Sequence, residues 1–121
     1  MCENIRTDIK VRLLSDKKFF GPGICELLEE IGKCGSIQAA CKEMGLSYSK
    51  GSHILKNLEK GLGIPMVQRW TGGSGGGGAE LTEEARQMIR SYRSMVRDIE
   101  SYAKEAYRKY FSDILGECAG K

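Results

Sequence analysis

Glycines dominate residues 71–79, which read T-G-G-S-G-G-G-G-A, and this run is well suited to contact another molecule through its backbone. Glycine accepts positive φ and leaves backbone N–H groups accessible, so the run suits a phosphate cradle, a flexible linker or the tip of a β-wing. The phosphate loop of nucleotidases also needs a lysine, and the run contains none. No βαβ unit surrounds the run, as a dinucleotide site would require. These features favour a wing; a loose hairpin tip without a binding role is the alternative.

Other side chains capable of chemistry are sparse. The five cysteines are unevenly spaced without a Cys-x-x-Cys pair, and His53 is the only histidine, which argues against structural zinc. We therefore expect no metal and no cofactor. Reduced thiols that serve as small apolar residues are expected, and a redox sensor based on Cys34 or Cys41 is the alternative. No nucleophile–base pattern is present, so we do not expect an enzyme.

The bulk properties suit one ordinary domain. With 121 residues, 40% of them hydrophobic and 29% charged, the chain can bury a modest core and stay in solution. It has no apolar stretch of about twenty residues and no apolar N-terminal signal segment, so we expect a cytoplasmic protein. The net charge is only +3, and residues 36–82 form the most basic segment. This charge is compatible with binding to nucleic acid but does not demonstrate it.

The glycine run follows a series of elements that would position it. Residues 8–14 alternate polar and apolar side chains and residues 18–20 can return beside them, which predicts an N-terminal β-hairpin. A first helix is predicted from the apolar spacing between residues 24 and 34. Ser36 is the expected N-cap of a second helix, which Gly45 would end, and Ser47 the N-cap of a third helix that reaches about residue 60. The last two helices with their tight turn are typical of a helix-turn-helix, whose second helix enters the major groove of DNA.

A wing and a long helix are predicted to complete the chain. A candidate strand at residues 64–70 and a return at residues 80–82 enclose the glycine run. Thr82 would cap the last helix, whose apolar residues alternate at spacings of 4 and 3, a heptad seam. A helix of about thirty residues spans roughly 45 Å, too long for so small a domain to cover, so we expect a homodimer. The predicted dimer residues are Ala85, Met88, Ile89, Tyr92, Met95, Val96, Ile99, Tyr102, Ala103 and Ala106.

The fold class is thus predicted to be mainly α with small β elements, a winged helix-turn-helix with an N-terminal hairpin and a long C-terminal dimerisation helix. Residues 1–82 would form the DNA-binding part and residues 83–121 the dimerisation helix of the same compact unit.

The motifs, in this order, resemble the winged-helix domain of LysR-type regulators, and more closely that of the molybdate-responsive ModE branch. The resemblance covers about residues 8–100 and is carried by F-G-P-G-I at 20–24, G-S-I at 35–37, S-Y-S-K at 47–50, R-W-T-G-G at 69–73 and G-G-G-G-A at 75–79. The chain departs from the branch at Ser74, where members usually have lysine, and at Gly51-Ser52, where many have Ala-Trp. We expect Gly51 to loosen the third helix. Full-length members continue into β-barrel domains that bind molybdate, which this chain is expected to lack.

The resemblance implies a dimeric transcriptional regulator that binds double-stranded DNA at a pseudo-palindromic operator, with genes of molybdate transport or metabolism as candidate targets. The third helix would contact bases and the wing would contact the backbone. The residues expected to bind DNA are Ser36, Ser47, Tyr48, Ser49, Lys50, Ser52, His53, Lys56, Arg69, Thr71, Gly72, Gly73, Ser74, Gly75 and Gly76. A dimeric adaptor with little specific DNA binding is the alternative, favoured by the low net charge and the missing wing lysine. The sequence assigns no small-molecule effector.

Overall fold

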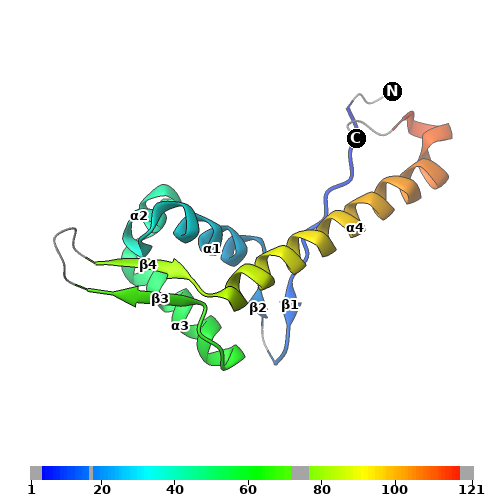
Figure 1. Ribbon diagram of the computed structural model, residues 1–121. Helices are drawn as coiled ribbons and strands as arrows, with labels where there is room; N and C mark the ends of the chain where they lie inside the picture. Colours follow the sequence, from blue (N-terminus) through cyan, green and yellow to red (C-terminus); the bar gives the residue numbers. More distant parts are fainter. Residues whose placement is uncertain (1–3, 17, 72–76, 118–121) are drawn as a thin grey trace. The chain divides into compact units, whose positions relative to one another are not determined.

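The computed structural model describes residues 4–16, 18–71 and 77–117, with the elements in the order β1-β2-α1-α2-α3-β3-β4-α4 (Figure 1). The chain forms two compact units. The first is Val11–Ser91, and the second combines the first ten residues with Tyr92–Lys121. Within the first unit, α1, α2 and α3 pack together, and the ribbon of β3 and β4 runs beside them (Figure 1). Among the described residues, no helix is both long enough and apolar enough to cross a membrane.

The predicted N-terminal hairpin is present but short. β1 (Leu13–Leu14) pairs antiparallel with β2 (Lys18–Phe20), with Leu13 opposite Phe20. Residues 8–12 were expected to belong to the first strand, but β1 begins only at Leu13. The hairpin nevertheless places Phe20 in the core, where its side chain is fully buried.

Three helices follow, and each begins where a capping residue or proline predicts it. α1 (Pro22–Cys34) starts at a proline, whose fixed φ suits the first turn. The N–H of Ala39 donates to Ser36 Oγ at the start of α2 (Ile37–Glu43), and the N–H of Lys50 donates to Ser47 Oγ at the start of α3 (Tyr48–Leu62). α3 runs two residues further than predicted, because Gly63 takes the left-handed conformation that ends it.

The two strands predicted to flank the glycine run form an antiparallel ribbon. β3 (Val67–Trp70) pairs with β4 (Gly78–Leu81), with Val67 opposite Leu81 and Trp70 opposite Gly78. β3 starts three residues later than expected. The N–H of Ala79 donates to the carbonyl of Gly35 at 2.8 Å, so the ribbon is tied to the end of α1.

α4 (Glu83–Leu115) is a single helix of 33 residues. As predicted, Thr82 caps it: the N–H of Ala85 donates to Thr82 Oγ1 at 3.1 Å. In the second unit, the hydroxyl of Tyr107 donates to the carbonyl of Gly116 at 2.8 Å, and the Tyr107 ring stacks on Phe111. The hydrogen bond to Gly116 holds the chain beyond the last turn of α4 against the helix. The predicted fold class, mainly α with small β elements, is confirmed.

Candidate nucleic-acid interface

The outward face of α3 carries most of the side chains expected to contact bases. Gly51, Leu55 and Leu58 are buried at helical spacing, so the opposite face of α3 turns to solvent. Tyr48 is 53% exposed at the first residue of the helix, and Ser52 is partly buried. The remaining predicted residues of this face are all exposed, namely Ser49, Lys50, His53 and Lys56. The structure thus brings these six residues together on one helix.

The two serines predicted to contact DNA serve as helix caps. Ser36 Oγ accepts the N–H of Ala39 at 3.0 Å, and Ser47 Oγ accepts the N–H of Lys50 at 3.1 Å. A hydroxyl that accepts one hydrogen bond still has its own O–H to donate. Each serine can therefore cap its helix and donate to a phosphate oxygen with the same group.

Asn57 also lies on this face, although it was not among the residues predicted to bind DNA. It lies four residues after His53, is exposed, and its Nδ2 is 3.1 Å from His53 Nε2. The spacing of four residues from a selected residue would have revealed it, because residues i and i+4 share a helix face. An asparagine amide can bond two edge atoms of adenine, so Asn57 is a candidate for reading bases.

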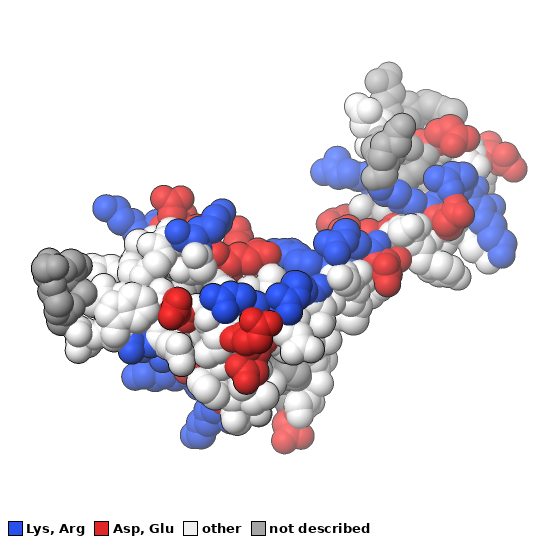
Figure 2. Space-filling view, in the orientation of Figure 1, with Lys and Arg blue, Asp and Glu red and all other residues white. Residues whose placement is uncertain are grey.

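Basic side chains dominate the charge of α3. The helix contains three lysines and one glutamate, Glu59, which is paired with Arg69. Lys and Arg side chains gather at the lower left edge of the molecule, over α3 (Figure 2). This distribution suits a surface that approaches the phosphates of DNA.

Gly51 allows α2 and α3 to pack closely. A Cβ atom at this position would lie 2.1 Å from Cys41 Sγ, so the thiol occupies the space that a side chain would need. Burial also raises the pKa of the Cys41 thiol above its ordinary value. α3 continues through Gly51, which is buried, so the helix is unbroken at the residue expected to loosen it.

Two of the residues predicted to bind DNA lie in the described part of the wing, Arg69 and Thr71. Arg69 is 40% exposed and pairs with Glu59, with 3.6 Å between Nη2 and Oε1. Trp70 is half exposed and Thr71 is exposed. The other wing residues expected to bind DNA lie outside the described residues: Gly72, Gly73, Ser74, Gly75 and Gly76.

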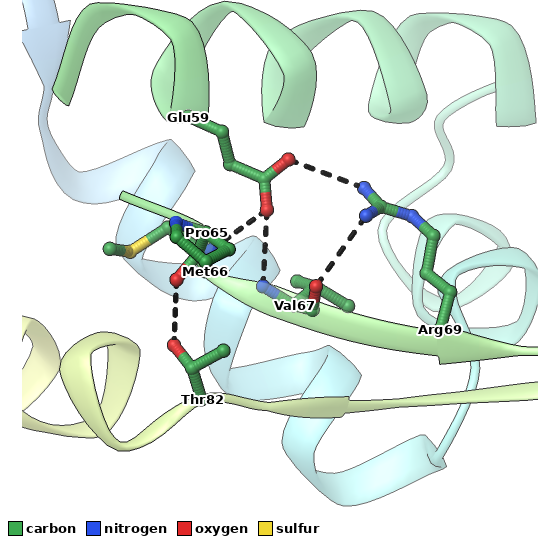
Figure 3. A network of polar contacts seen from close by, with 6 residues as sticks. All are labelled: Glu59, Pro65, Met66, Val67, Arg69 and Thr82. Carbon is green, nitrogen blue, oxygen red and sulfur yellow. Dashed lines mark hydrogen bonds and ion pairs between the residues drawn. The ribbon is translucent and has the colours of Figure 1, made fainter. Parts of the chain in front are cut away.

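Glu59, which was not among the residues predicted to bind DNA, connects α3 to the wing (Figure 3). Its Oε2 accepts the N–H of Met66 at 2.8 Å and the N–H of Val67 at 3.2 Å. On the other side of β3, the hydroxyl of Thr82 donates to the carbonyl of Pro65 at 2.9 Å. No sequence signal marks Glu59, because its partners lie beyond a turn whose path the sequence does not specify.

Most residues predicted to form a dimer interface are partly accessible, and two are not. Ala85 is completely buried and Tyr92 is 3% exposed, so the side chains of both are enclosed by the chain itself and we remove them from the predicted interface. Tyr102 is 75% exposed. The other seven are partly buried: Met88, Ile89, Met95, Val96, Ile99, Ala103 and Ala106. Exposed apolar side chains continue beyond them at Tyr110, Phe111 and Ile114.

The cysteines do not form a metal site in the part of the chain that the structure describes. Cys25 and Cys41 are buried, Cys34 is exposed, and none of the three forms a disulfide. Within the described ranges, no group of three or more histidine, cysteine or acidic side chains is arranged to hold a metal ion.

Comparison with known proteins connects this geometry with a family. Residues 25–86 match the family of bacterial regulatory helix-turn-helix proteins, lysR family. The transcriptional regulator ModE of Haemophilus influenzae is 36% identical over 84 residues, which are 69% of this chain and 33% of that protein. The molybdenum-pterin-binding protein MopB of Rhodobacter capsulatus is 41% identical over 66 residues, 54% of this chain and 24% of MopB. The chain therefore spans a third or less of the length of these relatives.

A solved structure shows the same fold. The CbnR_DBD chain in a crystal structure of the CbnR_DBD–DNA complex superposes with a TM-score of 0.55 at 17% sequence identity, covering 72% of this chain and 94% of that one. The likeness confirms the predicted winged helix-turn-helix fold.

Proposed function

Because the chain belongs to the lysR family of bacterial regulatory helix-turn-helix proteins, we propose that it is a transcriptional regulator that binds double-stranded DNA. α3 enters the major groove, and the wing lies along the adjacent phosphates. The relatives named for ModE and for molybdenum support genes of molybdate transport or metabolism as the targets. The protein acts in the cytoplasm and not as an enzyme.

The outward face of α3 is the observation that carries this proposal. Tyr48, Ser49, Lys50, His53 and Lys56 are exposed on the helix that follows the tight turn. The lysines supply attraction to phosphate, and the hydroxyl and imidazole groups, together with the amide of Asn57, can bond the edges of bases. The first turn of α3 is where such helices touch bases, and Ser47 fixes this turn by capping it.

A homodimer explains the long helix. α4 has 33 residues, and Tyr102, Tyr110 and Ile114 expose large apolar side chains in its second half. Pairing of α4 with its copy removes this surface from water. Two α3 helices related by a two-fold axis then read a pseudo-palindrome whose half-sites lie one helical turn of DNA, or a multiple of it, apart.

Fluorescence anisotropy tests this function with the DNA upstream of the protein's own gene and a shuffled control, at two salt concentrations. We expect selective binding that weakens as salt rises. Lys50→Ala should reduce affinity by about 1–3 kcal/mol, or roughly 5- to 150-fold. Lys33→Ala serves as the matched control, because it removes an exposed lysine of α1 rather than of α3.

Equal and weak binding to both DNAs would contradict the proposal and favour the dimeric adaptor. A loss of affinity in Lys33→Ala as large as that in Lys50→Ala would show that total charge, and not the face of α3, determines binding.

A further inference from the structure

Glu59 anchors the first residues of the wing to α3. Its Oε2 accepts two backbone N–H groups, those of Met66 and Val67, at 2.8 and 3.2 Å. Met66 and Val67 are almost fully buried, so both donors need a partner within the protein. β4 pairs with the other edge of β3 in a ribbon of only two strands. A side chain from α3 therefore supplies the acceptor for this edge of β3.

The second oxygen of Glu59 faces Arg69. Oε1 lies 3.6 Å from Arg69 Nη2, and Arg69 Nη1 is 3.5 Å from the carbonyl of Val67 (Figure 3). A guanidinium carries five N–H donors in one plane, so these contacts orient the group and leave donors for another acceptor. The side chain of Arg69 is 40% exposed, against 18% for Glu59. Arg69 is thus held between the two elements proposed to touch DNA.

We propose that Glu59 is a positioning residue for DNA binding, which fixes the wing to α3 and orients the Arg69 guanidinium for a phosphate of the DNA backbone. This inference rests on the proposed function. Orientation before binding lowers the conformational entropy that Arg69 loses when it meets the phosphate. A carboxylate close to DNA repels the phosphates. At Glu59 this repulsion is offset by the N–H groups of Met66 and Val67 and by the guanidinium of Arg69, which explains a glutamate at this position.

Glu59→Gln separates the two roles of the residue. The amide oxygen of glutamine can still accept the N–H groups of Met66 and Val67, because one carbonyl oxygen has two lone pairs. The NH₂ group then takes the place of Oε1 and faces the Arg69 guanidinium as a second donor. We expect the wing to stay anchored while Arg69 loses its orientation.

A double-mutant cycle of Glu59→Gln and Arg69→Met, with the same DNA and salt series, tests the proposal. Arg69→Met should weaken binding roughly tenfold, as expected for one charge-assisted hydrogen bond. It should also lower the slope of log K against log salt by about 0.9, the value for one phosphate contact. Glu59→Gln should reproduce part of both losses in the wild-type background and add nothing in the Arg69→Met background. Glu80→Gln is the matched control, since it removes the same charge from the exposed side of β4.

Trp70 reports on the anchoring, because it is the only tryptophan of the chain and lies next to Arg69. In Glu59→Gln, the Trp70 emission and the thermal unfolding temperature should stay close to those of the wild type. In Glu59→Ala, both should change. Equal effects of Glu59→Gln in both backgrounds, or no effect in either, would overturn the assignment of Glu59. Lack of selective binding by the wild-type protein would instead overturn the proposed function itself, and with it this assignment.

Discussion

At the scale of single residues, Cys41 and Gly51 share one space between α2 and α3. Alanine would improve the helix propensity of position 51 by up to about 1 kcal/mol. Its Cβ, however, would lie 2.1 Å from Cys41 Sγ. We expect Gly51→Ala to lower the free energy of unfolding by about 1–3 kcal/mol, the usual cost of overpacking a core. Urea denaturation measures the change.

The control for this prediction is the double variant Cys41→Ala, Gly51→Ala. Removing the sulfur makes room for the new methyl group, so the double variant should be more stable than Gly51→Ala alone. If the loss of stability in the double variant equals the sum of the losses in the two single variants, the two residues do not compete for space.

The described thiols differ in how far solvent can reach them. Burial raises the pKa of the Cys41 thiol, and at Cys34 partial desolvation and the Glu30 carboxylate also raise the pKa. The thiolate is the reactive form, so both react slowly near pH 7, but only Cys34 is open to a reagent. Native alkylation followed by mass spectrometry should label Cys34 before Cys25 and Cys41, and unfolding should remove the difference. Early labelling of Cys41 would show that α2 and α3 separate readily.

Residue types predicted the local contacts but not the distant ones. Ser36, Ser47 and Thr82 were expected to cap helices because a hydroxyl reaches the N–H of the third residue after it, whatever the rest of the fold does. Glu59 bonds residues seven and eight positions away, across the end of α3. Such a contact depends on the path of the turn, and no local pattern encodes it.

At the scale of elements, helix starts were predicted better than strand lengths. A cap or a proline marks a helix start in the sequence, whereas a strand extends only as far as its partner. β1 contains only the last two residues of the expected 8–14 strand, and β2 contains three residues. The outward face of α3 could be predicted because the buried residues of the helix recur at helical spacing. The length of the ribbon of β3 and β4 could not be predicted in this way.

The ribbon of β3 and β4 depends on Gly78. A Cβ at this position would lie 2.5 Å from Trp70 Cζ2 and 3.2 Å from the carbonyl oxygen of Gly35. Gly78→Ala should therefore displace the indole, shift its emission and weaken DNA binding several-fold. Fluorescence spectra and anisotropy measure these effects.

Gly61→Ala is the matched control, because a Cβ there would meet no atom within 4 Å. It should leave emission and binding unchanged and stabilise α3 slightly. An unchanged spectrum in Gly78→Ala would show that the indole does not need the contact with Gly78.

At the scale of the whole molecule, the proposed homodimer would cover the exposed apolar residues of α4. Tyr102→Glu places a charge in the proposed seam between two copies, and we expect it to convert a dimer into a monomer. Sedimentation velocity measures the mass, and operator affinity should fall because a monomer contacts one half-site. Ser101→Glu is the control, since it adds the same charge to the neighbouring exposed residue. A dimer that persists in Tyr102→Glu would place the interface elsewhere.

The hydrogen bonds of Thr82 bear on local unfolding in the first unit. Its hydroxyl accepts the N–H of Ala85 at the start of α4 and donates to the carbonyl of Pro65, while its own N–H donates to Met66. The N–H of Met66 in turn is held by Glu59 of α3. The end of α3, the residues before β3 and the start of α4 thus share one connected set of hydrogen bonds, and we expect them to release their amide protons together. In hydrogen exchange, the amides of Met66 and Ala85 should therefore exchange at a common rate, as one cooperative opening unit.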